Sequence, residues 1–493
     1  MLAGALTPLA FAPFHLFPLA VIAPAVLFVT WLNASAARAA WRGFLFGLGL
    51  FGVGVSWVYV SLHNYGNMPP PLAGFAVLLF VAALALYPAL LGALQAQLRT
   101  LPSGWRVGLV MPALWVLVEW LRGWFLTGFP WLNLGYSHTD TPLAGYAALV
   151  GVYGMSFAVA LTAGLIAAAW LDRTRALTVY APLAVTLWFG GWLASQPVWV
   201  QPAGQPLQVA LVQANIPLAI KWRRDFRESI VDSHVSLSER APRADLIVWP
   251  ESAVPGFFDQ VAPQLLPRLG AIARSRNTDF VIGAVERDVA TRAYYNSVFT
   301  VGAKQASYRK QHLVPFGEFL PLPEVFGRLL ATLQIPMSDF SRGTPGQALL
   351  HAAGHTLGVS VCYEDAFGEE VIATLPAATL LVNVSEDSWF GKSFAPHQRL
   401  QMARVRALES GRPMVRAANS GPSVVIDHRG DVVTRSPQFE PYVLSASVQP
   451  MTGATPYVRY GNTPIIALLF ILLLPAAWCA RRRRAIPLFG VQK

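Results

Sequence analysis

The chain has 493 residues, of which 54% are hydrophobic and only 13% are charged. The mean hydropathy of +0.45 is too high for an ordinary soluble protein, and the apolar residues are concentrated in residues 1–200 and 463–480. The formal net charge of +11 does not indicate a nucleic-acid partner, because much of the arginine lies beside apolar segments, where membrane topology explains it. We therefore expect a membrane part and a globular part, residues 206–449, that buries its own core.

The membrane part is predicted from apolar runs that are long enough to cross a bilayer. The first segment, residues 1–13, is short and contains Pro8 and Pro13, so we expect a truncated span or a re-entrant piece. Together with it, the pattern predicts about eight spans: seven within residues 1–200 and a final transmembrane helix at the C-terminal end. The remaining seven apolar segments are 17–33, 41–62, 71–97, 107–124, 149–171, 176–194 and 463–480.

The distribution of positive charge predicts how these spans are oriented. Arg481–Arg484 follow the last span and place the basic tail, residues 481–493, in the cytoplasm. The domain at 206–449, one span earlier, is then expected outside, and the outer loops 63–70 and 195–205 contain neither Lys nor Arg. The arginines of the inner loops are Arg38, Arg42, Arg99, Arg106, Arg173 and Arg175. An outward domain without a disulfide pair suits a bacterial periplasm.

Two polar residues near the outer end of a span admit two interpretations. Glu119 and Arg122 are three residues apart, so they can lie on one side of a helix. An intramembrane pair of this kind either holds helices together or lines a site for a lipid headgroup. The sequence alone leaves both alternatives open.

In the globular part, strand-like and helix-like stretches alternate. The stretches 222–240, 259–275 and 396–410 are predicted as helices. The mixture contains more β-structure than a purely parallel fold needs, so we expect an α/β sandwich. The predicted strands are 207–213, 245–249, 280–285, 296–302, 357–362, 379–384, 413–418, 423–427 and 442–448.

One cysteine stands at the end of a predicted strand. The apolar run at 357–361 ends on Cys362, and the turn-like Tyr363-Glu364-Asp365 follows. This arrangement suits a nucleophile held near backbone N–H donors, but for a single cysteine the favoured interpretation is a buried structural thiol, which only the rest of the chain can overturn. The only other cysteine, Cys479, ends the last apolar span, so no intradomain disulfide is expected. Because Cys/His metal spacings are also missing from the sequence, we expect neither a metal nor a cofactor.

A catalytic thiol requires a base or a cation, because an unperturbed cysteine with a pKa of about 8.5 is mostly protonated at neutral pH. Glu251 follows a predicted strand and is expected at a sheet edge. Lys310 lies in a loop rich in polar and ring residues. Taken singly, each of them is better explained as a solvated charge or a structural ion pair. The residue pattern alone does not establish that they meet Cys362 in space.

Three motifs in order resemble the Glu-Lys-Cys signature of the nitrilase (carbon–nitrogen hydrolase) superfamily. They are Trp249-Pro250-Glu251-Ser252, the segment Lys310–Glu318 (KQHLVPFGE), and Val361-Cys362-Tyr363-Glu364. With its flanking spans, the chain resembles the membrane-bound apolipoprotein N-acyltransferase family over nearly every residue. Segments that carry this wider resemblance are VSWVYVSLHNYG, LRGWFLTGFPW, Lys221-Trp222 and Gln401–Glu409.

This resemblance implies a nitrilase-like α-β-β-α sandwich and a role for each motif residue. Cys362 is implied as the nucleophile, Glu251 as the general base and Lys310 as the group that stabilises the oxyanion. The residues implied as supporting the reaction or binding substrate are Glu318, Tyr363, Glu364 and Trp222. For Glu318 we favour orienting the lysine over a direct proton role, and the rings of Tyr363 and Trp222 are also compatible with packing alone.

The chain departs from the family pattern at one loop. Where the family usually shows Asn-Asp-Ala-Trp-Phe-Gly, residues 386–391 read Glu-Asp-Ser-Trp-Phe-Gly. The Trp-Phe-Gly end favours retention of the loop, but Glu386 adds a charge, and this leaves the role of the loop open. His397 stands at a predicted helix start, and we assign it no catalytic part.

The resemblance implies a ping-pong acyl transfer. The acyl donor is a phospholipid such as phosphatidylethanolamine, and the acceptor is the α-amine of the S-diacylglyceryl-cysteine of an apolipoprotein. The implied location is the bacterial inner membrane, with a periplasmic catalytic domain, membrane lipids as partners and no nucleic acid. One alternative is a membrane-tethered carbon–nitrogen hydrolase (amidase) that acts on a soluble amide. A transporter is disfavoured, because Glu119 and Arg122 are too few intramembrane polar residues.

Overall fold

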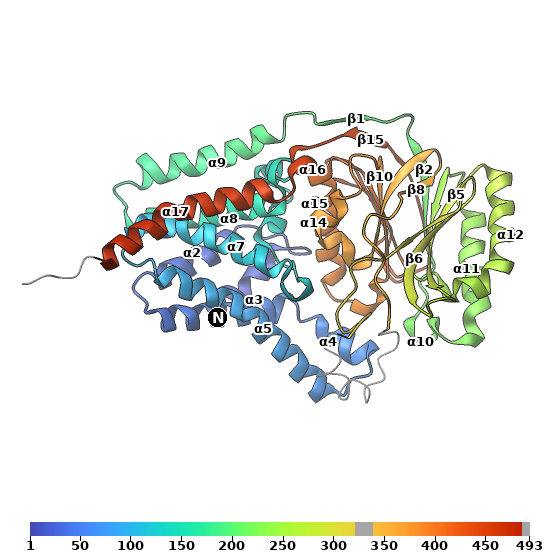
Figure 1. Cartoon of the computed structure of the whole chain (residues 1–493), viewed down its shortest axis with the longest axis horizontal. Helices are drawn as coiled ribbons and strands as arrows, with labels where there is room; N and C mark the ends of the chain where they lie inside the picture. The colour runs from blue at the N-terminus through green and yellow to red at the C-terminus, as the bar shows by residue number, and fades with distance from the viewer. Residues whose placement is uncertain (321–338, 486–493) are drawn as a thin grey trace, which may run out of the picture. The chain divides into compact units, whose positions relative to one another are not determined.

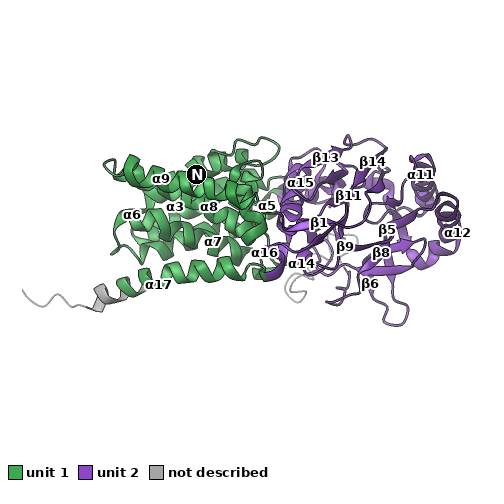
Figure 2. Ribbon diagram, turned by 90° about the horizontal axis from the view of Figure 1, so that it is seen from above, with its two compact units in different colours: residues 1–56, 74–197, 460–493 green, residues 57–73, 198–459 purple. Residues whose placement is uncertain are grey.

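A computed structural model describes residues 1–320 and 339–485 of the chain (Figure 1). The chain divides into two compact units (Figure 2). The first unit comprises residues 1–56, 74–197 and 460–493, and the second comprises residues 57–73 and 198–459. Residues 57–73, which the sequence pattern assigns to the membrane part, group with the second unit. Residues 486–493 of the predicted tail lie outside the described residues.

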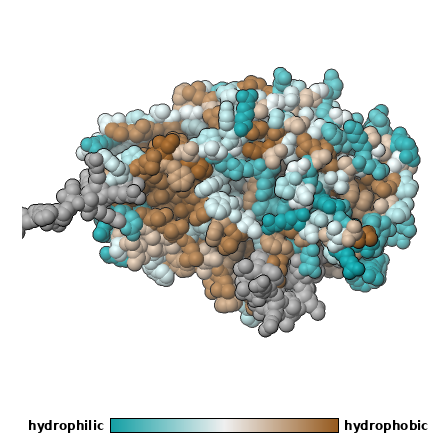
Figure 3. Space-filling model, in the orientation of Figure 1, coloured by the Kyte–Doolittle hydropathy of each residue, from teal (hydrophilic) through white to brown (hydrophobic). Residues whose placement is uncertain are grey.

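The first unit is helical, because long apolar runs satisfy their backbone hydrogen bonds within a helix. Large apolar side chains remain exposed along its helices, and Figure 3 shows hydrophobic residues gathered on this part of the surface. Such a surface is typical of helices that face lipid. The principal helices are α1 (Leu2–Leu6), α2 (Leu19–Trp31), α3 (Ala36–Gly54), α5 (Pro70–Ala96), α7 (Met111–Arg122), α8 (Ala147–Leu171), α9 (Ala181–Ala194) and α17 (Thr463–Ala485).

Within the described residues, four helical segments are long and apolar enough to cross a membrane. They are Pro70–Ala96, Ser103–Arg122, Pro142–Leu171 and Ala176–Ala194. A fifth is added if Ala36–Gly54 and Val58–Tyr65, which meet at a bend of 57°, count as one span. Leu19–Trp31 and Thr463–Ala476 are shorter apolar helices. The helical membrane part is confirmed at this coarser level, whereas the predicted count of eight spans is not.

Two stretches of the predicted membrane part differ from continuous spans for local reasons. Residues 1–13 contain only the short helix α1 and one tight turn, Thr7–Ala10, because Pro8 cannot continue an α-helix ladder. The predicted span 41–62 is broken after Gly54, where glycines at 52 and 54 weaken the helix and Val55 leaves the helical conformation.

Glu119 and Arg122 are both buried, and each binds the loop that follows α7. The Glu119 carboxylate accepts hydrogen bonds from Trp115 Nε1 at 2.8 Å and from the backbone N–H of Leu134 at 2.9 Å. Arg122 donates to the Phe129 carbonyl at 2.8 Å and to Asn133 Oδ1 at 2.7 Å. Through these contacts the two side chains hold this loop on the end of the helix.

The second unit is built from two sheets that pack face to face. One sheet has the order β13-β12-β11-β10-β9-β8, and the other has the order β14-β2-β3-β5-β6-β7, with β4 paired to β5. The first contains β8 (Leu350–Ala352), β9 (His355–Val361), β10 (Leu380–Ser385), β11 (Met414–Ala418), β12 (Val424–Ile426) and β13 (Val432–Arg435). The second contains β2 (Leu207–Gln213), β3 (Leu246–Val248), β4 (Val254–Phe257), β5 (Asp279–Arg287), β6 (Tyr294–Val301), β7 (Ala306–Arg309) and β14 (Tyr442–Val448).

Helices cover the outer face of each sheet, which completes an α-β-β-α sandwich (Figure 1). Alternate strand residues from both sheets, such as Val248 and Val361, form the core between them. The helices α11 (Arg227–Arg240) and α12 (Phe258–Arg276) pack on one sheet, and α15 (Ala395–Ser410) packs on the other. The remaining strands, β1 (Val200–Pro202) and β15 (Met451–Gly453), pair with each other.

The parallel strands of both sheets carry polar residues just beyond their carboxyl ends. In one sheet β2, β3 and β5 are parallel neighbours, and in the other β9, β10 and β11 are. In α/β proteins the crevice beyond such strand ends is where ligands bind. Glu251 lies three residues after β3, Cys362 follows β9 directly and Glu386 follows β10 directly.

Residues 57–65 pack on the loop that follows β10. Ser61 Oγ donates to the Trp389 carbonyl at 2.9 Å. The rings of Trp57 and Phe390 meet edge to face with centroids 4.9 Å apart, and Tyr65 meets Trp389 at 6.2 Å. The Trp-Phe-Gly end of the 386–391 loop is therefore held by a segment from the first fifth of the chain.

Candidate active site

Cys362 lies in a strained turn at the end of β9. Its φ of +51° is in the left-handed region, which costs a non-glycine residue about 1–2 kcal/mol. Neighbouring groups hold the turn: Asn383 Nδ2 donates to the Cys362 carbonyl at 3.2 Å, and the Val361 N–H donates to the Glu364 carboxylate at 2.7 Å. Strain that the surroundings maintain in this way is typical of functional positions.

Glu251 is buried beyond β3 with one half of its carboxylate engaged. Asn296 Nδ2, from β6, donates to Glu251 Oε1 at 2.7 Å. Within the described part of the chain, Oε2 is buried without a hydrogen-bond partner. Burial raises the pKa of Glu251, and the charge of Lys310 opposes this increase. A carboxylate with a raised pKa and a free oxygen can accept a proton.

Lys310 follows β7 and is fully buried among carboxylates. Its Nζ lies 2.8 Å from Glu318 and 3.9 Å from Glu251. Burial disfavours the ammonium form, but the negative charges of Glu318 and Glu251 outweigh burial, so the pKa of Lys310 is raised. Asn296 Nδ2 also donates to Glu318 at 2.9 Å and so links the two carboxylates. The result is a fixed positive charge whose position is set by two acids.

The three residues influence one another electrostatically. Burial raises the pKa of the Cys362 thiol to about 12, and the negative charge of Glu251 adds to this increase. The positive charges of Arg399 and Lys310 act in the opposite direction. At neutral pH the sulfur is therefore protonated, and it attacks only when a base takes its proton during the reaction.

Glu364 connects the turn at Cys362 to the segment that carries Lys310. Its carboxylate accepts hydrogen bonds from the backbone N–H groups of Gln311 at 2.6 Å and His312 at 3.0 Å. It also accepts one from the Tyr308 hydroxyl at 3.1 Å. Glu364 thus joins β9 to the end of β7.

The ring of Tyr363 packs edge to face on His312 and Phe367, with centroids 5.7 and 5.0 Å away. The Tyr363 ring therefore has a packing role.

Lys221 explains how the atypical Glu386 is accommodated. The Lys221 ammonium forms a buried ion pair with the Glu386 carboxylate. It also donates to the backbone carbonyl of Glu251 at 3.1 Å and lies 6.0 Å from the centroid of the Trp222 ring. The charge that the sequence adds at 386 is therefore neutralised, and the pair joins the Glu251 segment to the 386–391 loop. Trp222 itself is partly buried beside this pair.

Sequence reasoning missed several residues that contact the predicted ones. Asn296 donates hydrogen bonds to both Glu251 and Glu318. The one sequence feature that could have indicated it is that an asparagine, which is unfavourable in strands, stands at the start of a predicted strand. Arg399 Nη1 lies 3.4 Å from Cys362 Sγ, but nothing in the sequence distinguishes it from the other arginines of its helix. Lys221 was noted only as part of a motif.

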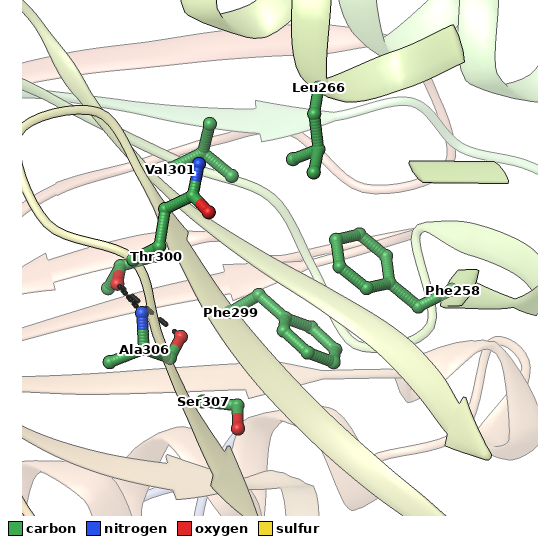
Figure 4. A pocket seen from close by; sticks show the side chains of 8 residues that line it. Phe258, Leu266, Phe299, Thr300, Val301, Ala306 and Ser307 are labelled. Carbon is green, nitrogen blue, oxygen red and sulfur yellow. Dashed lines mark hydrogen bonds between the residues drawn. The ribbon is translucent and has the colours of Figure 1, made fainter. Parts of the chain in front are cut away.

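A separate pocket lies between α12 and the strands β6 and β7 (Figure 4). Phe258 and Leu266 of α12 line it together with Phe299, whose ring stacks on that of Phe258 with the centroids 4.0 Å apart. Among the described residues that line this pocket, none is a predicted site residue. In the part of the chain that the structure covers, no group of three or more His, Cys, Asp or Glu residues is arranged to hold a metal ion.

Two protein families match different parts of this chain. Residues 208–457 match the family described as carbon-nitrogen hydrolase, and residues 3–165 match the family described as apolipoprotein N-acyltransferase N-terminal domain. The second unit therefore has the nitrilase-like carbon–nitrogen hydrolase fold, which confirms the predicted architecture of the globular part, and its chemistry is enzymatic.

Relatives that match nearly the whole chain identify its family. An apolipoprotein N-acyltransferase of Methylococcus capsulatus is 46% identical over 98% of this chain and 95% of its own length. One of Nitrosomonas europaea is 45% identical over 97% of both chains, and one of Azotobacter vinelandii is 42% identical over 98% of this chain and 94% of its own. The chain belongs to the apolipoprotein N-acyltransferase family, which confirms the predicted membership. The alternative of a tethered amidase is not favoured.

Proposed function

We propose that this enzyme carries out N-acyl transfer through a thioester on Cys362. The observation that supports it most directly is a partly buried thiol, held in a strained turn, whose pKa is shifted by the charges of both Glu251 and Lys310. In this assignment Cys362 is the nucleophile, Glu251 is the general base and Lys310 stabilises the oxyanion. Glu318 orients Lys310 through the 2.8 Å contact, and Glu364 fixes the turn.

In the first half-reaction, Glu251 takes the thiol proton while the sulfur attacks the ester carbonyl of a phospholipid such as phosphatidylethanolamine. The C=O double bond becomes an oxyanion beside the Lys310 ammonium. When the tetrahedral intermediate collapses, the ester C–O bond breaks and the departing alkoxide takes the proton back from Glu251. The products are an acyl-thioester on Cys362 and a lysophospholipid.

In the second half-reaction, the α-amine of the S-diacylglyceryl-cysteine of an apolipoprotein attacks the thioester. Glu251 accepts the amine proton, an amide forms and the C–S bond breaks, and the cysteine recovers a proton. Water competes with the amine for the same carbonyl, so the site has to exclude it. The burial of Glu251 and Lys310 is consistent with such exclusion.

We further propose that the chain crosses the bacterial inner membrane, with the second unit in the periplasm and the C-terminus in the cytoplasm. The arginine-rich inner loops, the outer loops without Lys or Arg, and the Arg481–Arg484 cluster support this orientation. An eight-span topology would count the bent pair at 36–65 as one span. It would also require the shorter helices Leu19–Trp31 and Thr463–Ala476, together with the first 13 residues, to cross at least part of the bilayer.

Labelling with a radioactive acyl chain tests the mechanism. The full-length protein in phospholipid vesicles that contain a radiolabelled acyl phospholipid should acquire label that hydroxylamine removes, and Cys362→Ala should acquire none. Cys479→Ala is the matched control and should label like the wild type. If Cys362→Ala still forms hydroxylamine-labile label, or if the wild type never does, the thioester mechanism is wrong.

Addition of a diacylglyceryl-modified lipopeptide to the labelled enzyme tests the acceptor. Label should move from the protein to the lipopeptide when its α-amine is free and should stay on the protein when that amine is acetylated. A soluble amide should not discharge the label. Transfer to water alone at the same rate would contradict the proposed acceptor and would support hydrolysis.

A further inference from the structure

Four charged side chains form a buried cluster behind the turn at Cys362. They are Arg399 of α15, Arg416 of β11, Asp365 and Asp387, and each is at most 1% exposed. Arg399 lies 2.9 Å from both Asp365 Oδ1 and Asp387 Oδ1, and Arg416 lies 2.6 Å from Asp387 Oδ2. Two positive and two negative charges balance, so the cluster can be buried without a net charge.

Arg399 contacts the nucleophile residue with both arms of its guanidinium. Nη1 donates to Cys362 Sγ at 3.4 Å, and Nη2 donates to the Cys362 carbonyl at 2.6 Å. The Asp365 and Asp387 contacts hold the plane of the guanidinium, so its orientation toward the sulfur is fixed before any substrate arrives. An arginine remains protonated at any pH that the fold tolerates, so its charge is always present.

The charges that face the sulfur come from four elements. Glu251 beyond β3 and Asp387 after β10 raise the pKa of Cys362, whereas Arg399 on α15 and Lys310 beyond β7 lower it. Lys310 already binds Glu318 and Glu251 and is assigned to the oxyanion. Within the described residues, Arg399 is the one cation with a hydrogen bond to the sulfur.

We propose that Arg399 is a further catalytic residue, which stabilises the Cys362 thiolate through its N–H···S hydrogen bond. This inference rests on the proposed role of Cys362 as nucleophile. When Glu251 removes the thiol proton, negative charge forms on Sγ and the contact with Arg399 strengthens. Once the S–C bond forms, that charge moves to the carbonyl oxygen near Lys310. When the amine expels the sulfur, the charge returns to Sγ and Arg399 stabilises it again.

The two cations therefore have separate tasks in this scheme. Lys310 acts while charge is on the oxygen, and Arg399 acts while charge is on the sulfur. Removal of Arg399 should raise the pKa of Cys362, because an opposite charge at this distance typically lowers a pKa by about 1–3 units. It should slow both half-reactions and leave the binding of phospholipid unchanged.

Alkylation of the thiol provides a direct test that does not require turnover. In a Cys479→Ser background Cys362 is the only thiol, so the rate of reaction with iodoacetamide reports its thiolate fraction. Arg399→Gln should reduce this rate by about tenfold or more between pH 8 and 10. Arg404→Gln is the matched control: it lies on the same helix, its side chain donates to the Gly430 carbonyl, and it should leave the rate unchanged.

A second variant allows for the loss of charge balance in the cluster. Arg399→Gln leaves Asp365 short of a partner, so Arg399→Gln/Asp365→Asn restores neutrality and should melt within a few degrees of the wild type. Asp365→Asn alone removes a negative charge and should leave alkylation equal or faster. If the double variant is alkylated more slowly than the wild type, the loss of Asp365 does not explain it, because that change alone does not slow alkylation. The slower alkylation is then attributable to the loss of Arg399. An unchanged rate in the folded double variant overturns the proposal.

The labelling assay separates this inference from the function on which it rests. If the wild type forms the acyl-thioester and the double variant forms it at least tenfold more slowly at neutral pH, with partial recovery at pH 9–10, the role of Arg399 is supported. If the wild type forms none, the proposed function fails, whatever the alkylation rates are. If both form it at equal rates, only the role of Arg399 is wrong.

Discussion

The sulfur of Cys362 lies between opposing electrostatic effects. Burial and the carboxylate of Glu251 raise its pKa to about 12, while the cations on two sides lower it. An isolated thiolate would be available to any electrophile that entered the site. A thiol that loses its proton only to an adjacent base remains unreactive until a substrate carbonyl is in place. The arrangement therefore couples reactivity to substrate binding.

This coupling gives a prediction for Glu251→Gln. The neutral amide no longer raises the pKa of Cys362, so the thiolate fraction at a given pH should increase and alkylation by iodoacetamide should become faster. Acyl-thioester formation from phospholipid should nevertheless fall by about 100-fold or more, because the general base is gone. Slower alkylation in a folded Glu251→Gln protein would show that Glu251 does not act on the thiol as a negative charge.

The ion pair between Lys221 and Glu386 gives a prediction about stability. Glu386→Gln leaves a buried ammonium without its counter-charge, which typically costs about 3–5 kcal/mol. The melting temperature in detergent should drop sharply, and Lys221→Met/Glu386→Gln should recover most of the loss.

Arg223→Gln is the control for this pair. Arg223 pairs with Asp225 on the exposed surface, and loss of such a pair costs about 1 kcal/mol at most. Equal melting temperatures for Glu386→Gln and Arg223→Gln would contradict a stabilising role for the buried pair.

The site residues that could be predicted from the sequence are those that lie within short motifs. The strand ending at Val361 and the turn after it were predicted, and the structure places Cys362 at that strand end in a left-handed conformation. The neighbours of the site were not predictable. Asn296 and Arg399 lie 66 residues before and 37 residues after Cys362, and their relevance arises only when two sheets and a helix pack together.

Among the secondary-structure elements, β5 determines how closely the backbone around Glu251 can approach the sheet. Gly283 in β5 has no side chain, and an added Cβ would lie 2.4 Å from the Pro250 carbonyl and 2.8 Å from Glu251 Cα. The backbone around Glu251 passes so close to the strand that any larger residue has to displace it.

Gly283→Ala should therefore move the base without touching the other motif residues. Because a displacement of about 1 Å can cost about 100-fold in rate, we expect acyl-thioester formation to fall by that order. Gly270→Ala in α12 is the control, since its Cβ would meet only the flexible end of Arg274 and a helix gains about 1 kcal/mol from alanine. A fully active Gly283→Ala enzyme would mean that the position of Glu251 is less constrained than this packing indicates.

Elements with a clear period were predicted well from the sequence. The predicted helices 259–275 and 396–410 correspond to α12 and α15, and most strand predictions agree with the sheets within a few residues. The stretch 222–240 was predicted as one helix, whereas α11 begins at Arg227. Apolar content did not reveal the bend of 57° after Gly54, because it measures hydrophobicity and not helix continuity.

For the whole molecule, the proposed orientation predicts which surfaces a reagent outside the membrane reaches. In a Cys362→Ser/Cys479→Ser background, Lys304→Cys places a single thiol on an exposed loop of the second unit, and Arg173→Cys places one on an exposed connection between α8 and α9. In intact spheroplasts, a membrane-impermeant maleimide should label the first and not the second. Permeabilisation should make both reactive. The opposite pattern would reverse the topology.

The contact between residues 57–65 and the loop after β10 has a consequence for how the chain is made. Ser61 and Trp389, which it joins, are 328 residues apart in sequence. At a synthesis rate of about 5–20 residues per second, the second partner is synthesised about 16–66 s after the first. During that interval the residues of the 386–391 loop on which the aromatic side chains at 57 and 65 pack have not yet been synthesised. The nascent protein therefore has a vulnerable period that ends only when translation is four-fifths complete, and slow codons before position 389 would prolong it.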